Sequence, residues 1–94
     1  MSRTFNVSIV TPERSLFEGP AVYLAVPGGE GNMGILPDHA PLLSTLLPGQ
    51  FEIRLDEVAA KPLFFKTQKP GFIEVNKNIV SILLDAADSF ALAQ

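Results

Sequence analysis

The sequence predicts an all-β domain, either a sandwich or a barrel. Short segments in which apolar and polar residues alternate are typical of strands that bury one face. Proline, glycine and asparagine occupy the connections between these segments and favour turns. Eight segments fit the pattern, at residues 5–9, 15–18, 22–26, 42–47, 51–55, 63–67, 72–75 and 79–84. No internal repeat, low-complexity run or second domain interrupts the series.

Proline and glycine bound the first four of these segments. The first segment has apolar side chains at every second position, and the third repeats that alternation. The fourth lies between two prolines, and its six residues are too few for a stable helix, so an extended conformation is favoured. The breaks fall at Pro12, Gly19, Pro20, Pro27, Pro41 and Pro48.

Residue type also predicts the turns of the second half. Pro48-Gly49 suits the two central positions of a type II turn, in which the glycine takes φ > 0. The fifth segment and the returning sixth then form a hairpin. Asn76-Lys77-Asn78 predicts a hairpin loop between the last two segments, because asparagine tolerates the left-handed region better than most residues.

The last predicted strand carries apolar residues on both of its faces. Ile79 and Leu83 point to one side, whereas Val80, Ile82 and Leu84 point to the other. A two-layer sandwich buries only one face of each sheet, so the second apolar row needs another cover. The sequence therefore predicts either a partner surface over this row or a fold-back of the chain's own tail.

The alanine-rich tail is predicted to lie outside the sandwich. Residues 85–94 are long enough for two helical turns at most, and Phe90 and Leu92 are the side chains available for a fold-back. We therefore expect a sandwich domain over residues 1–85 and a short tail over residues 86–94.

Composition excludes several classes of function. The chain has 94 residues, 47% hydrophobic and 18% charged, as expected for one compact domain. It has no cysteine and one histidine, so a disulfide framework is impossible and a zinc site is improbable. A net charge of −3 disfavours nucleic-acid binding. No run has the length of a membrane span, and no signal peptide is expected before the first strand.

Asp38 and His39 are the residues around which a catalytic site would be expected if the chain were an enzyme. Neighbours in an extended chain point apart, so Asp38 is poorly placed to orient the imidazole of a hydrolase or isomerase. Ser44 is not part of a Gly-x-Ser-x-Gly nucleophile elbow. The sequence favours a turn histidine that hydrogen-bonds local backbone.

A glycine-rich run resembles a phosphate-binding loop in composition alone. Glu30-Gly31-Asn32-Met33-Gly34 lacks the Gly-Lys-Ser/Thr ending of that motif and favours a tight β-turn with a solvent-facing acid. No cofactor or metal site is expected. From the residues alone, a free-standing β-sandwich ligand-binding module remains an alternative.

The stretch from Val26 to Leu43 carries the most specific signal in the chain. It reads Val-Pro-Gly-Gly-Glu-Gly-Asn-Met-Gly-Ile-Leu-Pro-Asp-His-Ala-Pro-Leu-Leu. This resembles the signature of the epsilon subunit of rotary ATP synthases, Val-Pro-Gly-x-Glu-Gly-x-x-Gly-Ile-Leu-Pro-x-His-Ala-Pro-Leu. The likeness also covers residues 10–14, 16–19, 47–49 and 71–75 and the final strand.

The resemblance implies a fold, a role and two partners. The fold is the family's flattened β-sandwich of about ten short strands, at the foot of the central stalk. The role is non-catalytic: the subunit links gamma to the membrane c-ring of a proton-translocating F-type ATP synthase and couples ion flow to ATP synthesis. The implied location is peripheral, at the cytoplasmic face of the bacterial inner membrane.

The resemblance also assigns residues. The loop that faces the c-ring matches Glu30, Gly31, Asn32, Met33 and Gly34, and the signature turn matches His39, Ala40 and Pro41.

Two departures from the family pattern modify these expectations. Family members commonly have an acid at the position of Asn32, so an ion pair to a ring arginine falls to Glu30 alone. Many members continue into two C-terminal helices that inhibit ATP hydrolysis, and some bind ATP there around an Ile/Leu-Asp-x-x-Arg-Ala motif. Residues 84–89, Leu-Asp-Ala-Ala-Asp-Ser, contain no arginine. We therefore expect neither inhibition by helices nor ATP binding.

Overall fold

The computed structural model describes residues 3–55, 61–85 and 90–93, with backbone only for 90–93. These residues form ten strands and no helix, which confirms the predicted all-β class. The strands are β1 (Phe5–Val10), β2 (Ser15–Ala21), β3 (Tyr23–Gly28), β4 (Gly31–Ile35), β5 (Leu42–Leu46), β6 (Gly49–Arg54), β7 (Leu63–Thr67), β8 (Gly71–Asn76), β9 (Ile79–Leu84) and β10 (Phe90–Ala93).

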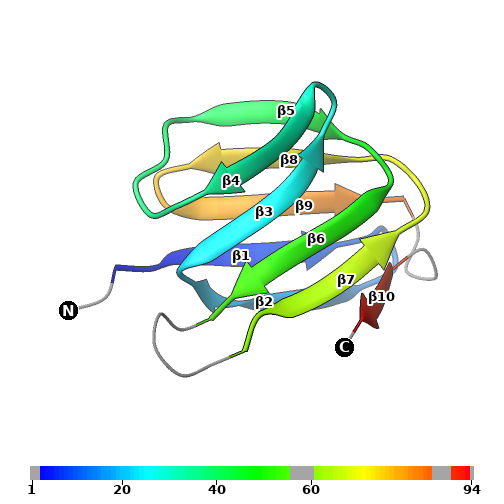
Figure 1. The fold of residues 1–94 in the computed structure, drawn as a ribbon, viewed down its shortest axis with the longest axis horizontal. Helices are drawn as coiled ribbons and strands as arrows, with labels where there is room; N and C mark the ends of the chain where they lie inside the picture. The colour runs from blue at the N-terminus through cyan, green and yellow to red at the C-terminus, as the bar shows by residue number, and fades with distance from the viewer. Residues whose placement is uncertain (1–2, 56–60, 86–89, 94) are drawn as a thin grey trace.

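The strands make one continuous sheet that curls into two layers (Figure 1). The order is β10-β7-β6-β3-β5-β8-β9-β1-β2, and β4 pairs with β3 beside this path. The layer of β3, β4, β6 and β7 crosses in front of the layer of β5, β8, β9, β1 and β2 (Figure 1). The layers meet where the end of β3 pairs with the end of β5, at Gly28 and Leu46.

The core lies between the two layers and follows the alternation seen in the sequence. In β1, β8 and β9 every second side chain is buried and the intervening ones face outward. Phe51 of β6 and Phe65 of β7 are each 1% exposed, and their rings stack with centroids 4.8 Å apart. The buried hydrophobic residues, apart from Val22, form one cluster, so this is one folding unit.

The β8–β9 hairpin confirms the turn predicted from asparagine. Asn76 pairs with Ile79, and the two residues between them, Lys77 and Asn78, have φ of 52° and 62°. Positive φ at both central positions is the requirement of a two-residue hairpin loop whose twist matches its strands.

The type II turn predicted at Pro48-Gly49 is wrong. Gly49 is the first residue of β6, where it pairs with Thr67, and it does not take a positive φ. A turn of the predicted kind, in which proline is followed by a residue with positive φ, occurs instead at Pro37-Asp38. A Pro-Gly pair is compatible with such a turn but does not require it, and here sheet pairing sets the backbone.

Three further strands differ from the sequence expectation. The break predicted at Gly19 and Pro20 is wrong, because β2 continues to Ala21 in pairing with β1. Residues 31–35, predicted as turns, form β4 because their backbone pairs along β3 from Leu24 to Gly28. Phe90–Ala93, expected as part of a helical or non-sandwich tail, forms β10 and pairs antiparallel with β7. A strand there covers the edge of β7, and this pairing overrides the helix propensity of alanine. The expected boundary after residue 85 adjoins residues 86–89, outside the described residues.

Candidate functional site

The β3–β4 hairpin carries Glu30 at its tip. Gly28 pairs with Gly31, so Gly29 and Glu30 form a two-residue turn, and Gly31 has φ of 129°, a conformation that favours glycine. A Cβ on Gly28 would lie 2.7 Å from the carbonyl oxygen of Gly31. The two ends of the turn therefore require glycine, and the tip presents an exposed carboxylate to solvent.

Contacts with β5 hold this tip in place. The Gly29 amide donates to the Thr45 carbonyl at 3.3 Å, and the Leu47 amide donates to the Pro27 carbonyl at 2.8 Å. A Cβ on Gly29 would lie 2.9 Å from the Thr45 hydroxyl oxygen, so the approach is close. The charge of Glu30 is thus carried on a turn that is tied to both layers of the sandwich.

The other residues matched to the ring-facing loop lie on β4 and do not share one surface. Asn32 is exposed and pairs with Pro27. The side chain of Met33 is half-buried and packs against the core. Gly34 lies beside Tyr23, whose Cε1 and hydroxyl oxygen would each be 3.4 Å from a Cβ at that position. Of the five matched residues, Glu30 alone places a charge at the hairpin tip.

The signature turn follows β4 and is stabilised by its own backbone. The His39 amide donates to the Leu36 carbonyl at 3.2 Å, which closes a turn over Pro37 and Asp38. Asp38 has φ of 66°, so the turn has the arrangement of type II, with proline second and a left-handed residue third. The His39 Nδ1–H donates to the Ala40 carbonyl at 2.6 Å. This is the local backbone bond that the sequence favoured.

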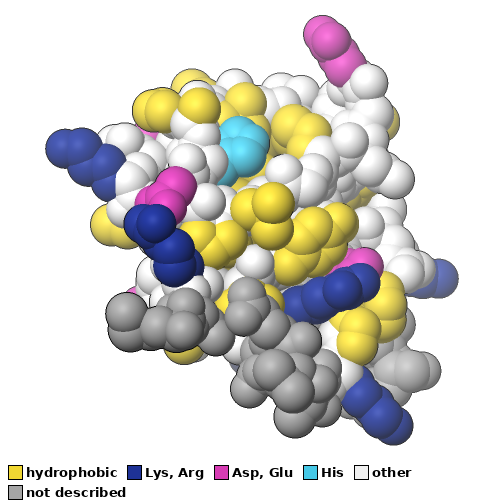
Figure 2. Space-filling view, turned by 60° about the vertical axis from the view of Figure 1, so that its left-hand side comes forward, with side chains coloured by type: hydrophobic (Ala, Val, Ile, Leu, Met, Phe, Trp, Pro, Cys, Tyr) yellow, Lys and Arg dark blue, Asp and Glu magenta, His cyan; other side chains and the backbone are white. Residues whose placement is uncertain are grey.

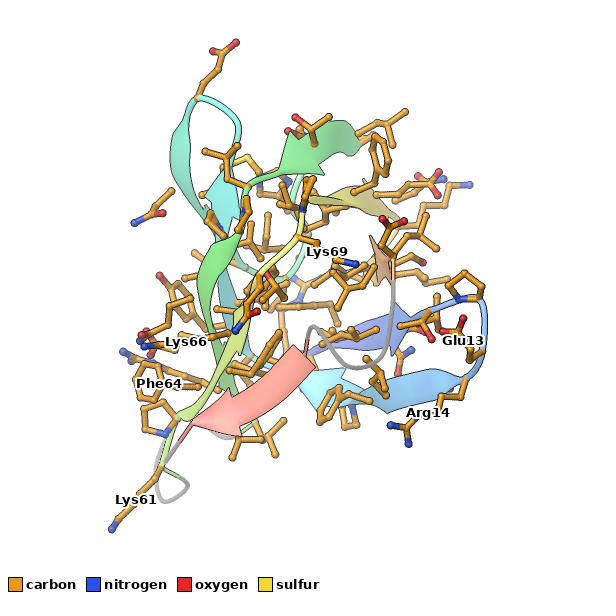
Figure 3. The ribbon with its side chains drawn as sticks, turned by 90° about the vertical axis from the view of Figure 1, so that its right-hand side faces the viewer. Glu13, Arg14, Lys61, Phe64, Lys66 and Lys69 are labelled. Carbon is orange, nitrogen blue, oxygen red and sulfur yellow. The ribbon has the colours of Figure 1, made fainter. Side chains whose placement is uncertain are left out.

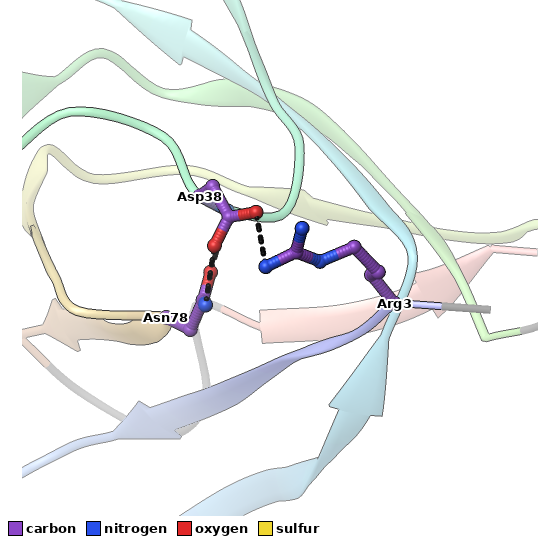
Figure 4. Close-up of polar contacts among 3 residues, drawn as sticks. All are labelled: Arg3, Asp38 and Asn78. Carbon is purple, nitrogen blue, oxygen red and sulfur yellow. Dashed lines mark hydrogen bonds and ion pairs between the residues drawn. The ribbon is translucent and has the colours of Figure 1, made fainter. Parts of the chain in front are cut away.

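Asp38 joins this turn to two distant segments (Figure 4). One carboxylate oxygen lies 2.6 Å from the Arg3 guanidinium, and the other accepts from the Asn78 side-chain amide at 2.9 Å. The Asp38 backbone N–H donates to the Asn78 amide oxygen at 2.6 Å. We call Arg3, Asp38 and Asn78 the turn clamp, since they hold the signature turn against the N-terminal segment and the β8–β9 hairpin.

The turn clamp leaves no catalytic pair at Asp38 and His39. The hydrogen bonds and ion pair of Asp38 go to Arg3 and Asn78, and the ring of His39 bonds backbone. The Ser44 hydroxyl donates to the neighbouring Thr45 carbonyl. Figure 2 shows the histidine in cyan among hydrophobic side chains. Across the described ranges, no three His, Asp or Glu side chains gather as a metal site requires.

The turn clamp was missed by the sequence analysis. Asn78 was correctly predicted as a loop residue, but no local pattern indicates that its amide meets Asp38. That contact exists because the curl of the sheet brings the two turns together, and the register of β8 and β9 then sets which residue faces the other.

A double-mutant cycle measures the side-chain part of the turn clamp. The variants are Asp38→Gly and Asn78→Gly. Both native residues have positive φ, which glycine adopts readily, so the substitutions introduce no backbone strain. We expect a coupling energy of about 0.5–1.5 kcal/mol from urea unfolding of the two single variants and the double variant. Arg3→Ala, which removes an exposed ion pair, is expected to cost less than about 1 kcal/mol. A coupling energy of zero would contradict the assigned contact.

A second surface is formed by the outward residues of β5, β8 and β9, which we call the outer face. On β9 Val80 is buried while Ile79 and Leu83 remain exposed, so its two apolar rows point to opposite sides as the sequence predicted. Leu43 of β5 is 75% exposed and Phe72 of β8 is 52% exposed. Nothing in the described part of the chain covers these four large side chains.

The fold is thus a curled ten-stranded β-sandwich that displays a charged hairpin tip and an apolar outer face. The chain belongs to the family described as the ATP synthase delta/epsilon chain β-sandwich domain, whose model matches residues 4–89. No helix among the described residues has the length and apolar character needed to cross a membrane.

Curated relatives agree with this family. An ATP synthase epsilon chain of Leptospira borgpetersenii serovar Hardjo-bovis (strain JB197) is 50% identical over 80 residues, which cover 85% of this chain and 60% of the relative. An ATP synthase epsilon chain of Janthinobacterium sp. (strain Marseille) is 36% identical over 87 residues, covering 93% of this chain and 61% of the relative. The chain therefore spans about three fifths of the length of these relatives.

Solved structures share the fold. A chain of the Euglena gracilis mitochondrial ATP synthase, solved as OSCP/F1/c-ring, superposes with a TM-score of 0.81 at 20% identity, covering 95% of this chain and 53% of that one. A chain of the Tetrahymena thermophila mitochondrial ATP synthase central stalk and c-ring gives a TM-score of 0.71 at 20% identity. The match covers 90% of this chain and 66% of that one.

Proposed function

We propose that this chain is a non-catalytic central-stalk subunit of a proton-translocating F-type ATP synthase. In this role it joins the gamma subunit to the c-ring and transmits torque between ion flow and ATP synthesis. Its location is the cytoplasmic face of a bacterial inner membrane, as a peripheral part of the complex. The proposal assigns it no cofactor and no ATP site.

The observation that carries this proposal is the pair of contact surfaces on one sandwich. The tip at Glu30 lies at the end of the β3–β4 hairpin, whereas the outer face belongs to the layer behind it (Figure 1). A subunit that couples two bodies needs two separate surfaces and a stiff connection between them. Pairing of β3 with β5 supplies that connection, because the hairpin and the outer face are parts of the same sheet.

The chemistry of the two surfaces suits different partners. A carboxylate at the tip of a hairpin suits a short contact with a basic loop, as expected for the polar loops of the c-ring. The apolar outer face suits a larger and more permanent contact, because burial of Leu43, Phe72, Ile79 and Leu83 removes hydrocarbon surface from water. We assign the tip to the ring and the outer face to gamma.

Binding and hydrolysis, measured together, test this proposal. The 94-residue chain is added to catalytic heads that contain gamma but lack this subunit. We expect tight binding with ATP hydrolysis nearly unchanged, because the described residues form no helix that can extend into the head. Absence of binding would contradict the proposed role, and strong inhibition would show that the sandwich itself regulates the enzyme.

A further inference from the structure

Glu74 stands at the centre of the outer face. Across the sheet it pairs with Leu43 on β5 and with Ser81 on β9. Phe72 and Asn76 flank it two positions away on β8, on the same side of the sheet. One carboxylate is thus surrounded by the large exposed side chains of this face, namely Leu43, Phe72, Ile79 and Leu83.

The side chain of Glu74 has no ion-pair or hydrogen-bond partner within the described part of the chain. None of the seven lysines and arginines occupies an outward position on β5, β8, β9, β1 or β2. Arg54 pairs with Glu52 on the opposite layer. Figure 3 shows Lys66 extending from β7, in the layer away from the outer face. Within the ranges that the structure describes, no cationic side chain therefore pairs with this carboxylate.

The surroundings of Glu74 are hollowed on both sides. One hollow, of about 340 Å³, is lined by Pro41, Leu43 and Asn76 together with Glu74. The other, of about 180 Å³, is lined by Asn76, Ile79 and Ser81 together with Glu74. The amide oxygen of Asn76 and the hydroxyl of Ser81 add neutral acceptors beside the carboxylate. This spread set of acceptors matches the five N–H donors of a planar guanidinium better than the three donors on the compact ammonium of lysine.

We infer that the outer face docks a partner surface that presents an arginine side chain, framed by apolar side chains, to Glu74. A large exposed apolar patch marks an interaction surface. Covering this patch also buries Glu74, and a buried carboxylate without a partner is strongly disfavoured. The partner must therefore bring the compensating cation to the middle of the contact. This deepens the proposed function and rests on it, since gamma is the partner assigned to this face.

Charge also argues against a second copy of the chain as the occupant. The other charged side chain at an outward position of this layer is Glu18 on β2, opposite Ser8 of β1. In a face-to-face pair of identical copies, the strands set against each other would carry these carboxylates and no lysine or arginine. The complementary charge therefore has to come from a different chain.

Affinity for gamma-containing catalytic heads tests the inference. We expect Glu74→Lys to weaken binding by about 100-fold or more, because it sets two cations against each other in a desolvated site. Glu74→Gln, which keeps the shape, is expected to lose about 10-fold. Glu18→Lys is the matched control, with the same change of net charge three strands away, and should stay within about 3-fold. Thermal unfolding of each variant verifies that the fold is kept.

The outcomes separate the inference from the function on which it rests. If the wild-type chain fails to bind, the proposed function is lost. If it binds and Glu74→Lys binds equally well, the function stands and the docking site is overturned. Equal losses for Glu18→Lys and Glu74→Lys would overturn it too, since they indicate a long-range effect of net charge. Dimerisation in sedimentation that Glu74→Lys abolishes would show that a second copy occupies the face.

Discussion

Phe51→Ala is expected to lower the free energy of unfolding by about 3–5 kcal/mol. Phe51 is 1% exposed, and its ring stacks on that of Phe65 at an interplanar angle of 17°. Truncation removes buried hydrocarbon, leaves a cavity and ends the stacking contact. A domain of this size has a total stability of about 5–14 kcal/mol, so this one change removes a large part of it.

Urea unfolding measures this loss, and Phe72→Ala is the matched control. Phe72 is 52% exposed on the outer face, so its truncation is expected to change stability by about 0.5 kcal/mol or less in the free chain. The midpoint should fall for Phe51→Ala while the slope stays constant, which indicates loss of stability alone. If both variants unfold at the same urea concentration, Phe51 is not the core residue described above.

Glu30→Lys is expected to reduce ATP-driven proton pumping several-fold in a complex that carries it. The carboxylate lies at the tip of the β3–β4 hairpin, where charge reversal sets a cation against the basic loop assigned to the c-ring. The stability of the free chain should change by about 0.5 kcal/mol or less, because an exposed turn charge contributes little to folding. Membrane vesicles report pumping and hydrolysis together, so uncoupling appears as hydrolysis without pumping.

Glu13→Lys is the control for this experiment. Glu13 is also an exposed glutamate on a turn, between β1 and β2, and Figure 3 shows it on a different loop from the β3–β4 hairpin. Both variants change the net charge equally. Normal pumping by both would remove the reason to assign the hairpin tip to the ring, whereas a loss limited to Glu30→Lys supports that assignment.

Local sequence predicted the features of this fold that local chemistry controls. The alternation of apolar residues identified the buried rows of β1, β8 and β9, and asparagine identified the β8–β9 turn. It failed where pairing decides the outcome. The residues next to Gly49 in the sequence suit either a turn or a strand. Its pairing with Thr67 of β7 places it in a strand. Phe90–Ala93 likewise becomes β10 because β7 offers an unpaired edge.

The residues of the candidate surfaces likewise include some that local sequence predicted and some that depend on strand pairing. Glu30 was predicted at a solvent-facing turn, since flanking glycines indicate one. The packing of half-buried Met33 against the core depends on β4 pairing with β3, which a glycine-rich sequence does not indicate. The central position of Glu74 depends on the register of three strands. In the sequence it is one of several scattered acids, and only the assembled sheet surrounds it with apolar side chains.

The position of β1 has a consequence for how the chain acquires its structure. β1 lies between β2 and β9, and its pairing with β9 is parallel, joining Val7 to Val80 across most of the sequence. During synthesis β1 can pair with β2 as soon as both strands have left the ribosome, but its other edge stays unpaired until β9 has been made. Closure of so long a loop is entropically slow, so folding is expected in milliseconds to seconds. Until then, β1 exposes an unpaired apolar strand, and the nascent chain is at its most vulnerable to aggregation.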